Sequence, residues 1–373
     1  MSSLGTEAAD YTEACTKCQR VGKLYKSQSN CPNIISLHTT RSSICAGKKS
    51  GQLLEKKKKS LDRLGKIVSA WRNSGGGQVL IHVEGQLPED RCLEQFDEFI
   101  TRSLTDLIDD GELYVDTYRR QWLSDIQKFR DYTNFVFVNV KKTNGLATVD
   151  FNTKVRNDIE NVSVTSANLG KCMLKRRKNT VSPTTRGLYE NTQLLHECRH
   201  IEIKALHVDR LKSAVATKLL RSPSDFVDYI WYDLKLKDNL TSMSKIEGGG
   251  SYYVGISENI LDIESCRTKI LNIDGFSIKF EESEITSAIE SKLQSDTIAL
   301  YGNNFCDVPV NLIEVRLHPI NGTDRRVLEV AVRCFDGIIF SDKDGPRAYE
   351  VKNNNIHRMD KAVWLERFTA VMT

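Results

Sequence analysis

Three glutamates are the side chains in this sequence whose positions best suit catalytic chemistry. Glu197 and Glu202 stand close together, and Glu258 follows the triplet Gly248–Gly250 and a short apolar run. The stretch Ile201–Ile203 alternates apolar and acidic residues, which is typical of a strand with one buried face. If the two strands that carry these residues are neighbours, the three carboxylates meet at one edge of a sheet.

Carboxylates that crowd into a small volume cannot all stay ionised without a counter-charge. A divalent cation such as Mg²⁺ or Mn²⁺ supplies that charge and leaves coordination positions for water and phosphate. Such a cation polarises a phosphoryl oxygen and lowers the pKa of the attacking water, which is the chemistry of metal-assisted phosphodiester hydrolysis. The alternative is that the three glutamates are solvated side chains beside strands, because acidic residues are mostly exposed.

The order of these features resembles the core domain of the Schlafen family. The shared pattern is Glu-x-x-x-x-Glu running into a strand, a helix, a Gly-Gly turn, and a hydrophobic strand that ends in Gly, an apolar residue and an acidic residue nearby. The resemblance implies that Glu197, Glu202 and Glu258 are the catalytic and metal-binding residues of an endoribonuclease that cleaves tRNA and rRNA. Glu258 stands where the family usually has aspartate, which shifts its carboxylate by about one methylene and affects the metal geometry.

Two further stretches resemble the same family. Val68–Gly77, followed by an apolar strand, is similar to the first-lobe signature, and Tyr349–Asn355, with Met359 and Trp364, is similar to the closing segment of the core. The resemblance implies an α+β fold of two related lobes, pseudo-dimeric and U-shaped, each a mixed sheet with helices. In such a core a basic groove between the lobes holds a double-stranded RNA stem, and the helicase region of the long members is absent.

Two Gly-Gly-Gly turns, each leading into an apolar strand, form an internal repeat over Gly75–Val83 and Gly248–Ile256. The repeat predicts two similar lobes, over 51–177 and 191–373, joined by a linker over 178–190. The Schlafen resemblance implies that the first lobe binds RNA without cutting it and that the second holds the nuclease site. Only the second repeat has an acidic pair upstream, because the region before the first turn is basic.

The segment Asp225–Leu236 has apolar residues at helical spacing, which predicts a helix packed on the second-lobe sheet. A polar loop is expected from Lys237 to Gly248. Neither glycine triplet has the Gly-x-x-x-x-Gly-Lys-Ser/Thr order that binds nucleotide phosphates, so we interpret the triplets as structural turns and expect no ATP binding.

Two local clusters of basic residues carry the argument for nucleic-acid binding, because a net charge of +4 over 373 residues is too small to establish it. Each cluster could neutralise several phosphates and so bind structured RNA by its shape and backbone. The alternative is that these are solvated helix starts and loops. The residues are Lys56, Lys57, Lys58 and Lys59 in one cluster, and Lys171, Lys175, Arg176, Arg177 and Lys178 in the other.

The first fifty residues are rich in Ser, Thr and Lys, which predicts a flexible tail over 1–50. Within it, the pair Cys15 and Cys18 has a zinc-binding spacing, and Cys31 with His38 or Cys45 could complete four ligands. One such pair without a clean second pair favours the tail, so structural zinc is not expected there.

Many Schlafen cores hold a structural zinc in the second lobe through a His-x-Cys element and a downstream cysteine pair. This chain offers only Cys306 and Cys334 in that region, so we expect that site to be lost and apolar packing to replace it.

Four aromatic and imidazole side chains near the glutamates could each have a functional or a purely structural role. Tyr252 and Tyr253 could stack on bases, although strand alternation predicts that one of them fills the core. His196 and His200 flank the acidic pair and could transfer protons or contact phosphate, or they could be bystanders.

The ten cysteines are too irregularly placed for a disulfide framework, and no secretory segment opens the sequence. These features predict an intracellular protein, cytoplasmic or nuclear. No apolar run approaches the length of a membrane span, so no membrane partner is expected.

The three glutamates and the Schlafen resemblance together imply a Mg²⁺- or Mn²⁺-dependent endoribonuclease for structured RNA such as tRNA. The resemblance also implies a second setting, a Schlafen-like complex with other Schlafen-like subunits that processes piRNA precursors. The main rival is a catalytically weak RNA- or protein-binding subunit. The Glu258 change and the missing zinc ligands favour the rival, and the Glu197/Glu202 pair opposes it. A second rival, a nucleotide-binding regulator, would bind ATP through Gly248–Gly250.

Overall fold

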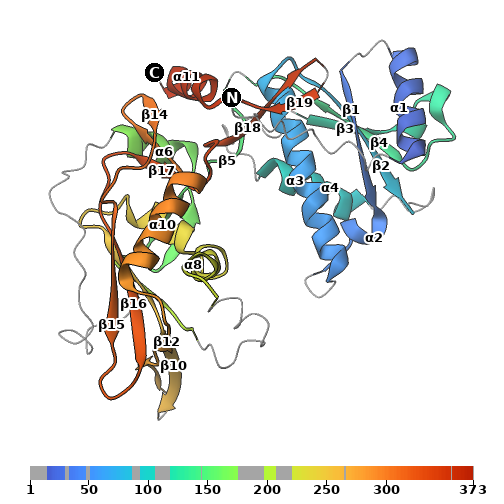
Figure 1. Ribbon diagram of the computed structural model, residues 1–373. Helices are drawn as coiled ribbons and strands as arrows, with labels where there is room; N and C mark the ends of the chain where they lie inside the picture. The colour runs from blue at the N-terminus through green and yellow to red at the C-terminus, as the bar shows by residue number, and fades with distance from the viewer. Residues whose placement is uncertain are drawn as a thin grey trace. The chain divides into compact units, whose positions relative to one another are not determined.

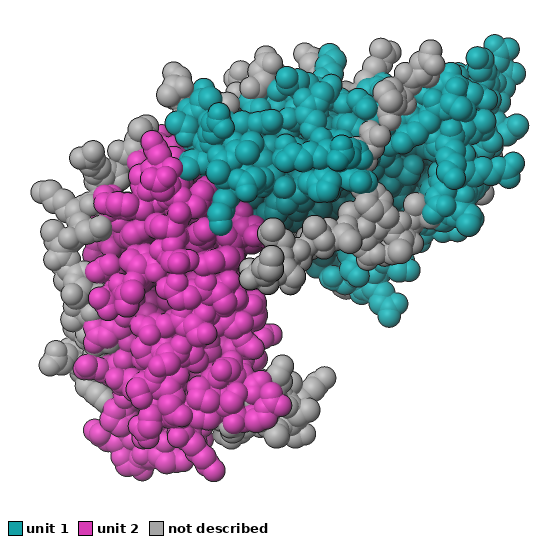
Figure 2. Space-filling model, turned by 45° about the horizontal axis from the view of Figure 1, so that its top comes forward, with its two compact units in different colours: residues 1–150, 346–373 teal, residues 151–345 magenta. Residues whose placement is uncertain are grey.

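The computed structural model describes residues 15–29, 33–47, 51–85, 93–105, 118–143, 145–174, 197–206, 221–263, 266–353 and 355–372. The chain divides into two compact units, coloured separately in Figure 2: unit 1 comprises residues 1–150 and 346–373, and unit 2 comprises residues 151–345. Both units combine helices with β-sheets (Figure 1), which confirms the predicted α+β class. None of the described helices is long and apolar enough to cross a membrane.

Unit 1 is built on a four-stranded sheet in the order β1-β2-β4-β3, in which β1 and β2 are parallel and the other pairs are antiparallel. Its elements are α1 (Thr16–Ser29), β1 (Ile34–Thr40), α2 (Arg41–Ile44), α3 (Gln52–Asn73), β2 (Gly77–Glu84), α4 (Leu93–Thr105), β3 (Tyr118–Trp122), η3 (Leu123–Asp125), η4 (Gln127–Phe129) and β4 (Phe135–Val140).

Alternate residues of β2 face two different cores in unit 1, because successive strand side chains point to opposite faces. Val79 and Ile81 pack with Trp71 and other residues of α3 and with α4. Leu80 faces the other side and packs with Tyr25 of α1. Helices α3 and α1 therefore cover opposite faces of one sheet.

The C-terminal segment completes unit 1 through a second, three-stranded sheet in the order β19-β18-β5. The buried Asn73 amide donates to the backbone oxygens of Ala147 (2.8 Å) and Tyr349 (2.9 Å), and Trp364 Nε1 donates to Thr148 Oγ1 (3.1 Å). The elements are β5 (Thr148–Asp150), β18 (Arg347–Lys352), β19 (Asn355–Arg358) and α11 (Lys361–Met372).

Unit 2 is built on a sheet in the order β12-β16-β9-β8, with β15 also paired to β16. Helices α8, α9 and α10 cover one face, and the hairpin β10–β11 lies at the other. The main elements are β8 (Ile201–Lys204), α8 (Pro223–Tyr232), α9 (Leu236–Met243), β9 (Gly250–Val254), β10 (Ile256–Ile263), β11 (Cys266–Ile273), β12 (Phe276–Ser277), α10 (Glu282–Asp296), β15 (Ile313–Pro319) and β16 (Arg325–Val332).

Smaller elements flank this sheet. They are β6 (Lys154–Asn157), β7 (Glu160–Ser163), α6 (Ser166–Leu174), β13 (Ile298–Tyr301), β14 (Asn304–Cys306) and β17 (Ile338–Phe340).

Both glycine triplets are helix-to-strand turns, as predicted. The first joins α3 to β2, and the second follows α9 and leads into β9. In each unit the strand after the turn pairs in parallel with a strand that precedes the helices, β1 in one case and β8 in the other. At Gly249 the backbone is left-handed (φ 66°), and a Cβ there would overlap the Val332 carbonyl oxygen. The pseudo-dimeric relation between the lobes stays a prediction.

The predicted flexible tail over 1–50 is wrong for residues 15–29 and 33–47, which form α1, β1 and α2. The Ser-, Thr- and Lys-rich composition conceals a few well-spaced apolar residues, such as Val21 and Leu37, that are almost fully buried. Strand β1 is an edge strand of the unit 1 sheet, so this segment is part of the fold.

The predicted domain boundaries also need correction. The units divide after Asp150 and before Pro346, so the predicted first lobe over 51–177 extends too far, and the second over 191–373 wrongly includes the C-terminal segment. The cause is the pairing of β18 with β5, which returns the end of the chain to unit 1. The predicted linker over 178–190 lies outside the described residues.

The helix predicted over Asp225–Leu236 corresponds to α8, but the predicted polar loop from Lys237 to Gly248 is wrong in its first part. Residues Leu236–Met243 form α9, which begins after Lys235 in a left-handed conformation (φ 60°). The polar residues from Lys237 onward are typical of a loop, although one face of this helix is buried.

Candidate active site and candidate metal centre

The predicted acidic residues come from three places around the edge of the unit 2 sheet. Glu202 lies in the middle of β8, which pairs in parallel with β9 and places Tyr252 opposite Glu202, so the prediction of neighbouring strands is confirmed. Glu197 precedes β8. The chain turns at Gly255 (φ 100°) and Glu258 lies in β10, rather than at the far end of β9.

The three glutamates lie within range of one another's charge. Burial raises the pKa of Glu197, and the negative charges of Glu202 and Glu258 raise it further. Lys204 and the backbone N–H of Ile203, which donates to Glu197 Oε1 at 3.4 Å, partly oppose this rise. The structure therefore brings the three predicted residues into one electrostatic neighbourhood.

Two cations hold the carboxylate of Glu202. Its side chain is 8% exposed, and Arg156 Nη1 lies 2.5 Å from Oε2 as an ion pair without hydrogen-bond alignment. Lys204 Nζ, which is partly exposed, contacts the other oxygen, Oε1. The Arg156 side chain is fully buried and also donates to the backbone oxygens of Cys198 (3.2 Å) and Ile201 (3.1 Å).

The glutamates do not form a tight ligand set in the described part of the chain. Their oxygens are not gathered within 4.8 Å of one another, in contrast to a thiol and imidazole cluster in unit 1. A divalent cation at this site would need Lys204 to leave Glu202 Oε1. Side chains would have to move before these glutamates could complete the coordination of a cation.

The position in β1 that corresponds to Glu202 is apolar. Glu202 stands opposite the third residue of β9, and Ile35 stands opposite the third residue of β2. This match agrees with the prediction that only the second repeat carries the acids. It also shows that the strand before the first glycine turn is β1, and not the basic region at the start of α3.

The neighbouring aromatic and imidazole residues have structural partners. Tyr252 and Tyr253 are both fully buried, so neither can stack on a base in this conformation. Their hydroxyls donate to the Leu234 carbonyl (2.8 Å) and to Glu329 Oε1 (3.0 Å). His200 Nδ1 contacts the Gly249 carbonyl at 2.6 Å, which ties the start of β8 to the glycine turn. His196 lies outside the described residues.

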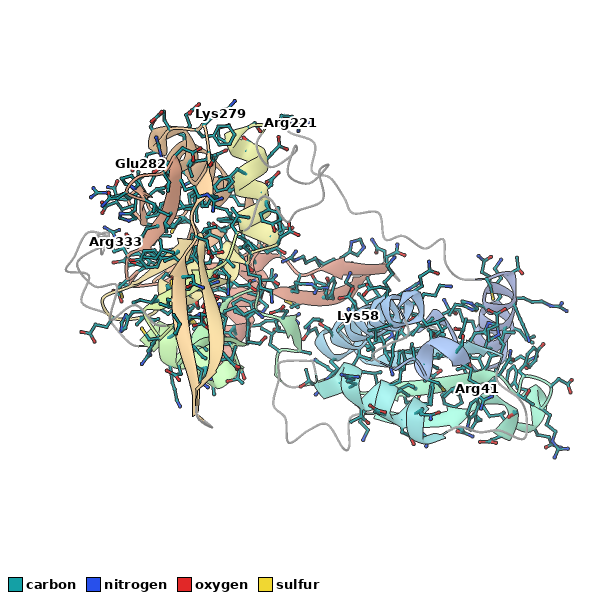
Figure 3. All side chains as sticks on the ribbon, turned by 90° about the horizontal axis from the view of Figure 1, so that it is seen from below. Arg41, Lys58, Arg221, Lys279, Glu282 and Arg333 are labelled. Atoms are coloured by element: carbon teal, nitrogen blue, oxygen red, sulfur yellow. The ribbon has the colours of Figure 1, made fainter. Side chains whose placement is uncertain are left out.

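The first basic cluster lies on α3. Lys56, Lys58 and Lys59 are exposed, and Lys57 is half-buried. Lys58, which Figure 3 labels, forms an ion pair with Glu55 at 2.9 Å. In the second cluster, Lys171 is exposed on α6. Its other members, Lys175, Arg176, Arg177 and Lys178, lie outside the described residues.

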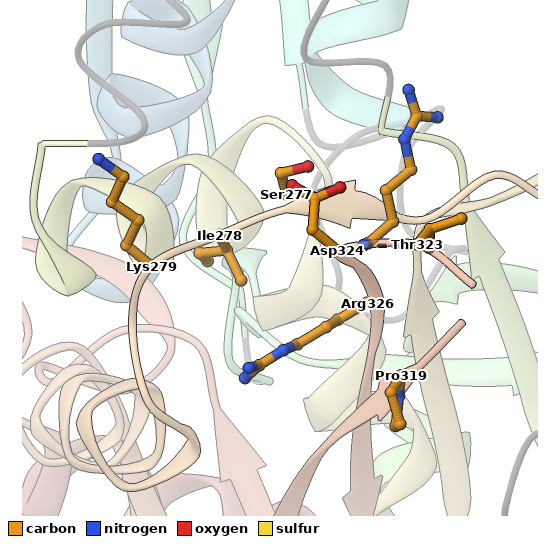
Figure 4. Close-up of a pocket in the computed structure, with 8 residues that line it drawn as sticks. Ser277, Ile278, Lys279, Pro319, Thr323, Asp324 and Arg326 are labelled. Carbon is orange, nitrogen blue, oxygen red and sulfur yellow. Dashed lines mark hydrogen bonds between the residues drawn. The ribbon is translucent and has the colours of Figure 1, made fainter. Parts of the chain in front are cut away.

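A basic hollow of about 570 Å³ lies in unit 2, lined by β12 and by the turn between β15 and β16 (Figure 4). It presents Lys279, Arg325 and Arg326, with Asp324 as the one acidic residue among those that line it. No sequence motif indicated this hollow, because its cations come from segments that are distant in the chain.

Four metal-ligand side chains converge in unit 1, three of them from the predicted flexible tail and the fourth, His82, from β2. Cys15 directly precedes α1 and Cys18 lies in its first turn, and His38 of β1 stands directly opposite His82 of β2 in the parallel pair. One ligand atom from each of the four lies within 4.8 Å of the others. The expectation that structural zinc is absent does not fit this geometry.

The titration behaviour of the cluster follows from its burial. Burial and the neighbouring Cys15 raise the pKa of Cys18 to about 12. Burial, followed by the nearby charges of His38 and Lys17, lowers the pKa of His82 to about 4. Without a bound cation, Cys18 is therefore a neutral thiol and His82 a neutral imidazole at pH 7.

The sequence contained part of the signal for this cluster. The cysteine spacing indicates Cys15, Cys18 and His38 as possible ligands, but it does not indicate His82, which is far away in the sequence. The pairing of β1 with β2 supplies it. Cys31, another possible ligand by its position in the sequence, lies outside the described residues, and Cys45 is exposed beside Gln95.

The second-lobe zinc site of the Schlafen resemblance has no counterpart in the described residues of unit 2. Cys306 is exposed on β14, whereas Cys334 is buried, and neither belongs to a group of metal ligands. Apolar contacts there include a tilted stack of Phe305 on Phe340.

Comparisons with known proteins do not place the chain in a family. No family model and no curated protein matches it. Among solved structures, it is similar to the DIP2311 protein from Corynebacterium diphtheriae, with 17% identity and a TM-score of 0.23. The match covers 55% of this chain and 28% of that chain. At this TM-score the likeness carries no argument about fold or function.

Proposed function

We propose that the chain is a divalent-metal-dependent endoribonuclease that cleaves structured RNA. Its active-site residues would be Glu197, Glu202 and Glu258. The observation that carries the proposal is the placement of Glu202 on the edge strand β8, with Glu197 before that strand and Glu258 in β10, where the charges of Glu202 and Glu258 both act on Glu197. Three carboxylates in one field disfavour their own ionisation, and a divalent cation relieves that cost. The Schlafen resemblance, which assigns the same three residues, supports the same site.

The metal ion and the two basic residues beside Glu202 would have different roles in catalysis. Mg²⁺ or Mn²⁺, when bound, supplies Lewis-acid activation of water and phosphate. Arg156 positions Glu202 from its buried side, since its guanidinium also fixes the backbone at Cys198 and Ile201. Lys204, the partly exposed partner of Glu202, is placed to contact a phosphate once it leaves the carboxylate.

The substrate class follows from the exposed lysines of α3 and from the resemblance. Lys56, Lys58 and Lys59 offer sequence-independent phosphate contacts. An RNA stem presents a regular backbone and 2′-hydroxyls, so it is recognised by shape rather than by base sequence. We therefore propose tRNA, rRNA or a stem-containing small-RNA precursor, such as a piRNA precursor, as the substrate.

The test is cleavage of end-labelled tRNA and of a labelled stem-loop by the purified chain, with Mn²⁺ or with EDTA. Glu197→Gln and Glu258→Gln remove one negative charge each, and Glu290→Gln, at an exposed position of α10, is the matched control. We expect cleavage that needs the metal and that falls by about 100-fold or more in the two site variants. Equal cleavage by Glu197→Gln and Glu290→Gln would contradict the assignment.

A second candidate function has its own supporting observation. Arg156 and Lys204 already occupy both oxygens of Glu202, so three carboxylates and two cations leave a net charge of −1 at the site. This residual charge attracts a divalent cation less than an uncompensated triad would. The chain would then be an RNA-binding subunit of a Schlafen-like complex with little activity of its own.

The same assay separates the two functions. Intact RNA in all lanes, together with binding whose affinity falls steeply as salt rises, would support the binding subunit. Fluorescence anisotropy with a labelled stem-loop measures this affinity. The variant Lys58→Gln should weaken binding modestly and to a similar extent for unrelated stem sequences.

A further inference from the structure

A cluster of two thiols and two imidazoles gathers where α1 meets the sheet of unit 1. The Sγ atoms of Cys15 and Cys18 are 3.2 Å apart, and the Nδ1 atoms of His38 and His82 are 3.1 Å apart. Three further distances join sulfur to nitrogen: Cys15 to His82 (3.4 Å), Cys18 to His82 (3.3 Å) and Cys18 to His38 (3.7 Å). Four potential ligand atoms thus surround one point.

These separations suit a single tetrahedral zinc ion. With Zn–S near 2.3 Å and Zn–N near 2.0–2.1 Å, the edges of the coordination tetrahedron are roughly 3.3–3.8 Å long. These five distances, from 3.1 to 3.7 Å, are close to that range. Two thiolates and two imidazoles favour zinc over Mg²⁺ or Ca²⁺, which prefer oxygen ligands.

In both histidines, Nδ1 faces the centre of the cluster and Nε2 contacts a side chain outside it. His82 Nε2 lies 2.7 Å from the side-chain amide of Asn134, and His38 Nε2 lies 3.5 Å from a carboxylate oxygen of Glu84. Such outer contacts fix the ring orientation of histidines that bind metals. The His82 ring also stacks on Phe135, with an interplanar angle of 6°.

We propose that Cys15, Cys18, His38 and His82 bind one structural zinc ion that fastens α1 to β1 and β2. All four coordination positions come from protein side chains, so the ion has no open position for water or substrate, which distinguishes a structural from a catalytic zinc. Two of the ligands, Cys18 and His82, are buried. This site is separate from the glutamates of unit 2 and does not depend on the proposed nuclease function.

The first experiment measures metal in the full chain, purified without a histidine tag, by elemental analysis. We expect about one zinc per chain, and an X-ray absorption spectrum with two sulfur and two nitrogen neighbours. Replacement of zinc by Co²⁺ should give the visible bands of a tetrahedral ion and a thiolate charge-transfer band. A chain that holds no stoichiometric metal and takes up neither Zn²⁺ nor Co²⁺ would overturn the proposal, as would a coloured preparation that contains iron.

Substitutions at and near the four side chains test whether the zinc ion is bound at this cluster. Cys18→Ser should lose the zinc, whereas Cys45→Ser, at an exposed cysteine of the same region, should keep it. If Cys18→Ser does not fold, Asn134→Ala tests the site without touching a ligand. It should lower zinc affinity by about tenfold or more, measured by competition with a chromogenic chelator. Zinc retained in Cys18→Ser, or unchanged affinity in Asn134→Ala, would place the ion elsewhere.

Discussion

At the scale of single residues, the role of Arg156 beside Glu202 could not be predicted from the sequence. Arg156 is one basic residue in a short strand, with no motif around it, yet it is fully buried and pairs with Glu202. The acidic residues could be predicted because their spacing and strand alternation are local properties. Their counter-charges could not, because Arg156 of β6 reaches Glu202 only in the folded unit, where it also contacts Asn239 of α9 and the Ile201 carbonyl of β8.

The carboxyl of Asp62 should give unit 1 an acid-sensitive contribution to stability. It pairs with Lys66 at 3.0 Å and with Arg347 at 2.5 Å. Burial alone would raise the pKa of Asp62, but the hydrogen bonds and charges of Arg347 and Lys66 outweigh it and hold the pKa below the usual 3.8.

A lowered folded-state pKa means that this stabilisation is complete above the unfolded value and is lost as the pH falls through the folded value. Below pH 4, the melting temperature of the natural chain should therefore decline more steeply than that of Asp62→Asn. Thermal melts followed by circular dichroism between pH 6 and pH 3 measure this. Parallel curves for the two chains would show that the ion pairs contribute nothing.

At the scale of elements, the helix, glycine turn and strand of each repeat could be predicted, since periodicity and glycine triplets are strong local signals. Helix α9 could not, because Lys237 and Asp238 near its start are typical of a loop. The helix is held in the fold by Leu236, Leu240 and Met243, which are all buried because they lie on one face of it.

The second glycine turn offers a matched pair of substitutions. Gly248 and Gly249 both have left-handed backbones, with φ of 81° and 66°. A Cβ on Gly248 would meet open space, whereas one on Gly249 would overlap the Val332 carbonyl oxygen.

Gly248→Ala should lower the free energy of unfolding by about 1–2 kcal/mol, the cost of a left-handed alanine. Gly249→Ala should lower it further, because β16 must also shift. Urea denaturation of both variants measures the difference. A Gly249→Ala protein as stable as Gly248→Ala would show that the contact with Val332 is easily relieved.

At the scale of the whole molecule, the sequence predicted two units but not where they divide. The glycine repeat indicated the number, because each copy begins a strand of its own sheet. The boundary depends on the pairing of β18 with β5, and nothing near Tyr349 in the sequence indicates that its partner strand lies in the other half of the chain.

Removal of residues 346–373 should damage unit 1 and leave unit 2 folded. The deletion removes the Tyr349 carbonyl from Asn73, the Trp364 indole from Thr148, and the Arg367 guanidinium from the Asn73 carbonyl (2.8 Å). Buried polar groups without partners are costly. Hydrogen exchange should show lost protection in β2 and β4 while β9 and β16 stay protected. Loss of protection in both units would contradict the division at Asp150 and Pro346.

The return of the C-terminal strands to unit 1 also bears on how the chain matures during synthesis. Domains generally fold as they leave the ribosome, from the N-terminus onward. Here the whole of unit 2 emerges before β18 and α11, so the unit begun first is finished last. Until then, Asn73 and Thr148 lack the partners that Tyr349 and Trp364 give them in the folded unit. Slowing translation over the final segment should therefore prolong chaperone association with the nascent chain.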